Sequence, residues 1–250
     1  DLGNQRENNE DAFLARAQHG LWILADGVGG LDAGEIASDI ACKSIADAVI
    51  AGESVEDAIQ SAHRDIIDAP TTGVGQRGMA STIVVLLVHG DTYQISWVGD
   101  SRAYLWGSGG DRQNAELKQL SKDQSLVQRL LDEGVITAEQ AVDHPRKNLV
   151  LQALGQPDLS KLEVETVRGQ FSQDDQLLLC SDGLSDYVSD KDISALLSAN
   201  ESTENKVNAL VNRALRNEGK DNITAILVDL TTQDLASTQE VEAVSIPRPQ

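Results

Sequence analysis

The sequence predicts an α+β fold in which two antiparallel β-sheets pack face to face and helices cover their outer sides. Segments with strand character mostly follow one another along the chain, whereas the long helical patterns come as one early pair and one late pair. At 250 residues, the chain is long enough for one large domain or two small ones. Because only 3% of the residues are aromatic, we expect a core built mainly from Leu, Ile, Val and Ala.

The first elements are a hairpin and two helices. Residues 12–15 and 20–25 have the pattern of paired strands with a carboxylate at the exit. From about Ala33 to Ile50 apolar residues recur at helical spacing, and a second helix is expected from about Val55 to Ile67.

Three strands come next. Residues 82–88 are almost continuously apolar, as in a strand buried on both faces. Residues 93–97 alternate between apolar and polar, as in a strand with one wet face, and residues 102–106 form a further strand.

Residues from about 120 to 155 change character and are interpreted as a helical insertion between strands. The helices expected there cover residues 126–133, 138–142 and 147–154. After the insertion we expect strands at 162–167, 176–180 and 223–228 and helices at 190–197 and 203–217. We interpret residues 1–230 as one domain and the polar residues 231–250 as a disordered tail or linker.

The composition of the chain argues against several classes of partner. A formal net charge of -20 argues against nucleic acid and against anionic membrane surfaces as partners, since both attract Lys and Arg. No apolar stretch is long enough to predict a membrane span, so we expect a cytoplasmic protein.

Cys42 and Cys180 are expected to be small core residues. Because the chain begins at Asp1 without Met, a removed targeting segment stays open.

Five short acidic motifs are spread over most of the chain, and three of them place an Asp just past an apolar or alternating run. They are Arg6-Glu7-Asn8-Asn9-Glu10-Asp11, Ala25-Asp26-Gly27-Val28-Gly29-Gly30, Val98-Gly99-Asp100-Ser101-Arg102, Ser181-Asp182-Gly183-Leu184 and Lys220-Asp221-Asn222-Ile223-Thr224. Taken singly, each Asp could be an ordinary turn or cap residue. Carboxylates gathered from distant parts of a chain repel one another unless a cation lies between them, and Mg²⁺ and Mn²⁺ prefer oxygen ligands.

In their order and wording these motifs resemble the protein phosphatase 2C (PPM) family of metal-dependent protein serine/threonine phosphatases, in its bacterial stand-alone form. The resemblance covers about residues 1–230. It implies a four-layer αββα sandwich with a helical flap at about residues 120–155. It also implies that Asp26, the carbonyl of Gly27, Asp182 and Asp221 hold two Mn²⁺ or Mg²⁺ ions.

The same resemblance assigns the remaining site residues. Arg6 would bind the substrate phosphate, as a guanidinium can through two parallel hydrogen bonds. Glu10 and Asp11 would lie behind the ligands and hold metal-bound waters, and Asn222 would lie in the same layer. Asp100 would contribute with Asp182 to a third, weaker metal site, although a turn role for Asp100 stays open.

The reaction implied is direct hydrolysis of phosphoserine and phosphothreonine in proteins by a metal-bridging hydroxide, with Arg6, Asp26, Asp182 and Asp221 as the catalytic group. The implied partners are phosphorylated proteins and a Hanks-type kinase that the enzyme opposes, and we expect a monomer. The alternative is a pseudophosphatase, a binding module that keeps the fold.

Three departures from the family pattern motivate that alternative. Val28 stands where the family commonly has Met, or His in some eukaryotic members, and Leu31 stands where it commonly has His. Gln124 stands where the family usually has a His before the Ser. Gln124 carries no proton that titrates near neutral pH, so an acid–base role for this position is in doubt.

Overall fold

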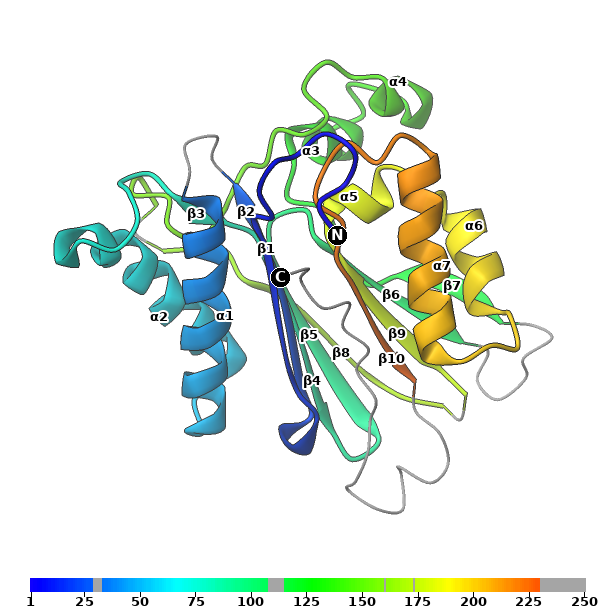
Figure 1. Cartoon of the computed structure of the whole chain (residues 1–250), viewed down its shortest axis with the longest axis horizontal. Helices are drawn as coiled ribbons and strands as arrows, with labels where there is room; N and C mark the ends of the chain where they lie inside the picture. The colour runs from blue at the N-terminus through cyan, green and yellow to red at the C-terminus, as the bar shows by residue number, and fades with distance from the viewer. Residues whose placement is uncertain (29–32, 108–114, 160, 173, 230–250) are drawn as a thin grey trace.

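Two antiparallel sheets lie at the centre of the molecule in the computed structural model, which describes residues 1–28, 33–107, 115–159, 161–172 and 174–229 (Figure 1). The first sheet has the order β1-β2-β4-β5-β8, with the short β3 paired to β2. Its strands are β1 (Asp11–Arg16), β2 (Leu21–Val28), β3 (Ala80–Ser81), β4 (Ile83–His89), β5 (Thr92–Val98) and β8 (Glu165–Gln170). The second sheet has the order β10-β9-β6-β7. Its strands are β6 (Arg102–Gly107), β7 (Glu116–Gln119), β9 (Gln176–Cys180) and β10 (Ala225–Asp229).

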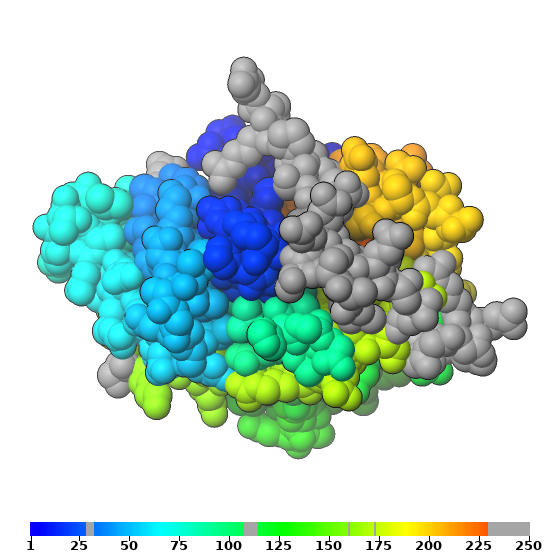
Figure 2. Space-filling view, turned by 90° about the horizontal axis from the view of Figure 1, so that it is seen from below, coloured from blue at the N-terminus to red at the C-terminus, as the bar shows by residue number. Residues whose placement is uncertain are grey.

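The helices form two outer layers and a separate flap. On the first sheet lie α1 (Gly34–Ile50) and α2 (Val55–Asp68), and on the second lie α6 (Asp190–Leu197) and α7 (Thr203–Arg216). The flap carries α3 (Leu126–Asp132) and α4 (Ala138–Val142), and the short α5 (Asp182–Ser185) follows β9. Single 3-10 turns, η1 (Ala17–His19) and η2 (Ala69–Thr72), complete the elements of the described chain. Figure 2 shows the helix layers on opposite sides of the molecule.

Alternation along the strands explains the four layers, because successive side chains of a strand point to opposite faces of a sheet. On β2, Ile23 packs with the α1–α2 layer, whereas Trp22 packs between the sheets. On β9, Leu178 packs with the α6–α7 layer and Leu179 between the sheets. The result is three apolar layers inside an αββα sandwich, which confirms the predicted fold class.

Serine caps set the starts of several helices at the expected places. Ser54 accepts a hydrogen bond from the main-chain N–H of Asp57 at 3.1 Å, and Ser189 and Ser202 cap α6 and α7 in the same way. A side-chain oxygen at this position binds an N–H that the helix leaves unpaired. The predicted bounds of α4, α6 and β9 match those of the structure.

The predicted helix at 147–154 is wrong. This segment runs as turns and two isolated bridges, Ser125 with Val150 and Ser81 with Leu154. Leu154 both donates to and accepts from the main chain of Ser81, at 2.8 and 3.0 Å. Those tertiary hydrogen bonds use the main-chain groups that a helix would need, so packing overrides the local helical pattern.

The predicted strand at 162–167 lies three residues later, as β8. Leu162 is buried in the α1–α2 layer instead, and Gln60 binds both of its main-chain groups. The pattern also missed β7, a polar strand at one edge of the second sheet, and α5, which is only 4 residues long.

Two further expectations concern the C-terminal tail and membrane-spanning helices. The predicted tail, residues 231–250, lies outside the described residues. Within the described ranges, no helix has the length and apolar character needed to cross a membrane.

Candidate metal centre

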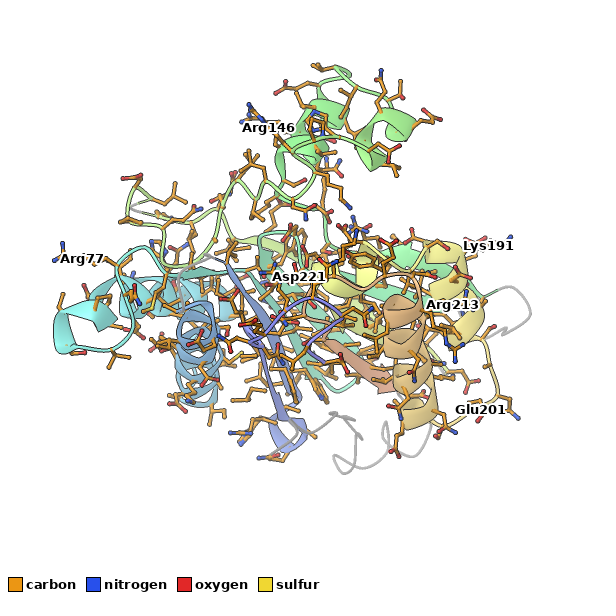
Figure 3. All side chains as sticks on the ribbon, turned by 45° about the horizontal axis from the view of Figure 1, so that its top comes forward. Arg77, Arg146, Lys191, Glu201, Arg213 and Asp221 are labelled. Carbon is orange, nitrogen blue, oxygen red and sulfur yellow. The ribbon has the colours of Figure 1, made fainter. Side chains whose placement is uncertain are left out.

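The five acidic motifs meet at one end of the sandwich, the end that carries the flap (Figure 1). Antiparallel pairing of β1 and β2 places Asp11 opposite Asp26. Pairing of β9 with β10 brings the chain before β10, with Asp221, to the end of β9, which Asp182 follows. Figure 3 labels Asp221 in the middle of this end, between the two helix layers. Asp100 lies in the turn from β5 to β6.

Asp26 and Asp182 are half-buried residues whose carboxylates repel each other. Burial, and then the charges of Asp11, Asp182 and Asp100, raise the pKa of Asp26 well above its ordinary value. Burial, and then Asp100 and Asp221, do the same to the pKa of Asp182. Within the part of the chain that the structure describes, neither carboxylate has a side-chain hydrogen bond or an ion pair. This end of the fold therefore gathers several negative charges, and neither Asp26 nor Asp182 has a direct cationic partner among the described residues.

Asp11 is a buried carboxylate with a different environment. Its Oδ2 accepts hydrogen bonds from Ser181 Oγ at 2.9 Å and Thr224 Oγ1 at 2.6 Å, which connects β1 to the ends of β9 and β10. Its Oδ1 is buried with no hydrogen-bond partner among the described residues. Burial raises its pKa to about 6, against the lowering effect of the two hydroxyls. Sequence reasoning did not single out Ser181 and Thr224 as its partners.

Arg6 and Asp221 form an ion pair at the mouth of the site. Arg6 Nη2 lies 2.7 Å from Asp221 Oδ2, and this hydrogen bond is the main cause that raises the pKa of Arg6. Asp221 Oδ1 accepts the main-chain N–H of Asn222 at 2.8 Å. Both carboxylate oxygens of Asp221 are thus engaged, while 46% of the Arg6 side chain stays exposed.

Asn222 holds the N-terminal segment in place. Its Oδ1 accepts the main-chain N–H of Glu10 at 2.8 Å, and its Nδ2 donates to the carbonyls of Asn8 and Leu2 at 3.0 and 3.2 Å. The side chain of Asn222 therefore acts on the backbone that presents Arg6 and Glu10. Burial raises the pKa of Glu10, whose side chain lies against Gly34 at the start of α1.

Two glycines allow the close packing that the site needs. A Cβ on Gly27 would overlap the carbonyl oxygen of Gly34, and a Cβ on Gly183 would overlap that of Asn222. Only glycine lets two backbones approach in this way. The Asp-Gly pairing in both motifs is thus explained by packing next to the ligand candidates Asp26 and Asp182.

Asp100 and Asp182 both line a cavity of about 260 Å³ between the flap and α5. Burial, and then Asp123, raise the pKa of Asp100 to about 7. Across this cavity Lys147 of the flap binds Asp186 at 2.8 Å. Sequence reasoning missed Lys147, because an ion pair between distant segments leaves no local pattern.

The three departures from the family pattern fall in different places. Val28 is partly buried on β2, and Leu31 lies outside the described residues. Gln124 is buried, with its amide bonded to the main chain of Gly99 and Glu163 and to the side chain of Glu165.

The donor set fits hard divalent cations. Among the described residues no group of three or more His, Cys, Asp and Glu side chains is arranged to hold one ion by itself, in line with the engagement of Asp221 by Arg6. Mg²⁺ and Mn²⁺ keep several waters and need only one or two carboxylates each. The unpaired, mutually repelling carboxylates of Asp26 and Asp182 and the orphaned Oδ1 of Asp11 supply that kind of site.

Comparison with known proteins identifies the family. Residues 4–230 match the family described as protein phosphatase 2C. The chain belongs to this family. The serine/threonine phosphatase stp of Listeria monocytogenes (strain F2365) is 36% identical over 242 residues, which cover 92% of this chain and 93% of that protein.

Solved protein phosphatase 2C structures share the fold. The crystal structure of Mycobacterium tuberculosis PstP/Ppp is 35% identical with a TM-score of 0.81, covering 92% of this chain and 96% of that one. The catalytic domain of PstP in complex with two manganese ions is 33% identical with a TM-score of 0.79, covering 92% and 95%.

These relatives confirm the prediction of a metal-dependent protein serine/threonine phosphatase. The pseudophosphatase alternative is not supported, since the relatives are named as phosphatases. The roles of individual residues stay predictions and are taken up next.

Proposed function

We propose that this phosphatase hydrolyses phosphoserine and phosphothreonine in proteins with two Mn²⁺ or Mg²⁺ ions held by Asp26, the carbonyl of Gly27, Asp182 and Asp221. The observation that carries the proposal is the pair of mutually repelling carboxylates of Asp26 and Asp182, neither of which has an ion pair or a side-chain hydrogen bond among the described residues. When bound, such ions activate a water molecule and neutralise charge on the phosphoryl group. Asp100 with Asp182 would offer a third, weaker position, in keeping with their shared cavity.

Arg6 would recognise the substrate phosphate. Its guanidinium is exposed and joined to Asp221 by one hydrogen bond, so further N–H groups are available for a phosphate in two parallel hydrogen bonds. Asn222 fixes the backbone that carries Arg6, through its bonds to Asn8 and Glu10. Binding then places the phosphate beside the carboxylates, and positioning together with charge supplies the rate increase.

Partners follow from the reaction. Phosphorylated proteins are the substrates implied by the named relatives, so a serine/threonine kinase of the Hanks type would supply them. We propose a cytoplasmic monomer. The free, buried thiols of Cys42 and Cys180 are in keeping with a reducing compartment. Gel filtration with light scattering tests the monomer, and a phosphoproteome of a deletion strain tests the substrates.

The first experiment measures hydrolysis of a phosphothreonine peptide with Mn²⁺, with EDTA, and with Asp182→Asn in parallel. Turnover should need the metal and fall by about 10²–10³-fold in the variant. Asp192→Asn is the matched control, because Asp192 lies on α6, is paired with Arg213 at 3.1 Å and does not line the cavity that Asp100 and Asp182 share. Metal-independent turnover, or equal losses in both variants, would contradict the proposal.

Arg6 is tested by its kinetic signature. Arg6→Ala should raise KM about 10–100-fold with a smaller effect on kcat, because a hydrogen-bonded charge pair contributes about 1.5–3 kcal/mol. Arg6→Lys should recover only part of this, since Lys cannot bind bidentately. An unchanged KM in Arg6→Ala would remove Arg6 from the phosphate site.

A further inference from the structure

Gln124 lies at the base of the flap and is almost fully buried, with 9% of its surface exposed. Both the oxygen and the nitrogen of its side-chain amide form hydrogen bonds. Oε1 accepts the main-chain N–H of Gly99 at 2.9 Å, and Nε2 donates to the carbonyl of Glu163 at 3.0 Å and to Glu165 Oε1 at 3.3 Å. A buried amide satisfied in this way holds three segments in register.

The main chain of Gln124 adds two more connections. Its N–H donates to the carbonyl of Gly99 at 2.9 Å, so Gln124 binds both main-chain groups of that glycine. Its carbonyl accepts the N–H of Leu151 at 2.8 Å, which joins the two ends of the flap. One residue thus connects the turn before Asp100, the approach to β8 and both ends of the flap.

The turn at Gly99 also contacts Thr82, which is hydrogen-bonded to the main chain of Asp26. Gly99 has a φ of +108°, and a Cβ there would come within 2.6 Å of the side chain of Thr82. Thr82 donates its N–H to the carbonyl of Asp26 at 2.8 Å and accepts the N–H of Asp26 at 3.3 Å. Its hydroxyl also lies 2.8 Å from that of Ser101, next to Asp100. A continuous set of contacts therefore runs from Gln124 to the backbones of Asp26 and Asp100.

We propose that Gln124 is a positioning residue for the phosphatase site: it joins the flap base to the Gly99–Asp100 turn and so holds the carboxylates of Asp100 and Asp26 in place for metal. This inference rests on the proposed metal site. It gives Gln124, which departs from the family pattern, a role that needs no titratable proton: an amide supplies the acceptor for Gly99 and the donor for Glu163 at any pH.

Gln60 offers a matched control for a merely structural amide. It binds both main-chain groups of Leu162, at 2.8 and 3.2 Å, and joins α2 to a loop. Gln60 thus holds the segment next to Glu163, which Gln124 also binds, but Gln60 has no hydrogen bond to Gly99 and does not line the cavity that Asp100 and Asp182 share. Loss of Gln60 should therefore affect stability without affecting the metal site.

The experiment compares Gln124→Leu, Gln124→His and Gln60→Leu with the unchanged protein. Mn²⁺ affinity is measured by calorimetry, flap order by limited proteolysis within residues 120–155, and kcat/KM on a phosphothreonine peptide. Gln124→Leu should weaken Mn²⁺ binding about 10-fold or more and speed cleavage in the flap, as losses of groups that orient metal ligands do. Gln124→His, whose ring nitrogens can accept and donate at similar reach, should recover most of the affinity.

Gln60→Leu should bind Mn²⁺ within about twofold of the unchanged protein, even if its Tm falls as far as that of Gln124→Leu. Equal Mn²⁺ affinities in Gln60→Leu and Gln124→Leu would overturn the inference. Should Gln124→Leu fail to fold, Gln124→Glu, which keeps the acceptor for Gly99 but loses the donor, should weaken Mn²⁺ binding in the same direction, and an unchanged affinity in it would overturn the inference.

A second comparison separates this inference from the proposed function. Combining Gln124→Leu with Asp100→Asn should give less than the sum of the two losses in Mn²⁺ affinity, since both act on the same carboxylate. Fully additive losses would overturn the link to Asp100. Absence of metal-dependent turnover in the unchanged protein would overturn the proposed function instead, while Mn²⁺ binding and flap cleavage would still test Gln124.

Discussion

Asp11 and Asp26 lie opposite each other on neighbouring strands, yet they have opposite surroundings. Asp11 is buried and accepts two hydroxyl hydrogen bonds from Ser181 and Thr224. Asp26 is partly exposed, and among the described side chains it has no donor and no cation. The first carboxylate connects the two sheets, and the second is left with a charge that an ion can neutralise.

The difference shows how one end of a sandwich can contain both a framework and a reactive centre. At Asp11 the two hydroxyl hydrogen bonds offset part of the cost of burying a carboxylate, whereas at Asp26 that cost has no such offset until a ligand binds. The Asp26 region therefore gives up stability in the metal-free protein in return for metal affinity.

The largest expected effect comes from removing the unpaired charge. Asp26→Asn should lower kcat/KM by about 10²–10³-fold. In EDTA the same variant should unfold at an equal or higher temperature than the unchanged protein, because Asp26 is repelled by Asp11, Asp182 and Asp100. Peptide hydrolysis and thermal unfolding measure the two effects, and a variant that is both active and less stable would break the comparison.

An intermediate effect should appear in the pH dependence of stability. Asp11 ordinarily titrates near 3.8 but has a pKa of about 6 in the folded protein, chiefly through burial. Between these values the native state binds more protons than the unfolded chain, so the free energy of unfolding falls as pH rises from about 4 to 6 and then levels off. The shift corresponds to up to about 3 kcal/mol.

Asp11→Asn should remove this part of the pH dependence. Urea unfolding in EDTA at several pH values should show that, as pH rises, the free energy of unfolding of the variant increases relative to that of the unchanged protein. Parallel curves from pH 4 to pH 7 would show that Asp11 does not titrate in the folded protein as its burial requires.

The smallest effect is expected from breaking a partly exposed ion pair, in which Asp186 is paired with Lys147. Lys147 and Asp186 have side chains that are 44% and 27% exposed. Lys147→Ala should therefore change the free energy of unfolding by less than about 1 kcal/mol, and kcat/KM by less than about fivefold. A larger loss of activity without loss of stability would show that Lys147 also contacts the substrate.

Much of the fold followed from local patterns. The helices expected at 190–197 and 203–217 match α6 and α7. The apolar runs at 82–88 and 177–180 match β4 and β9, because burial on both faces needs apolar residues throughout. The helix expected at 147–154 does not form, because the main-chain N–H and carbonyl of Leu154 are hydrogen-bonded to Ser81, which is far away in the sequence. The polar strand β7 at the sheet edge had no periodic signal to detect.

For the site, the sequence by itself determined which side chains are available: five acidic motifs at the edges of apolar strands, in an order typical of one phosphatase family. Only the tertiary structure decided how each carboxylate is used, because hydrogen-bond partners and burial come from segments distant in the chain. Ser181 and Thr224 make Asp11 part of the framework, Arg6 engages Asp221, and Gln124 turns inward to Gly99. No local pattern specifies such contacts, since each depends on where folding brings the partner.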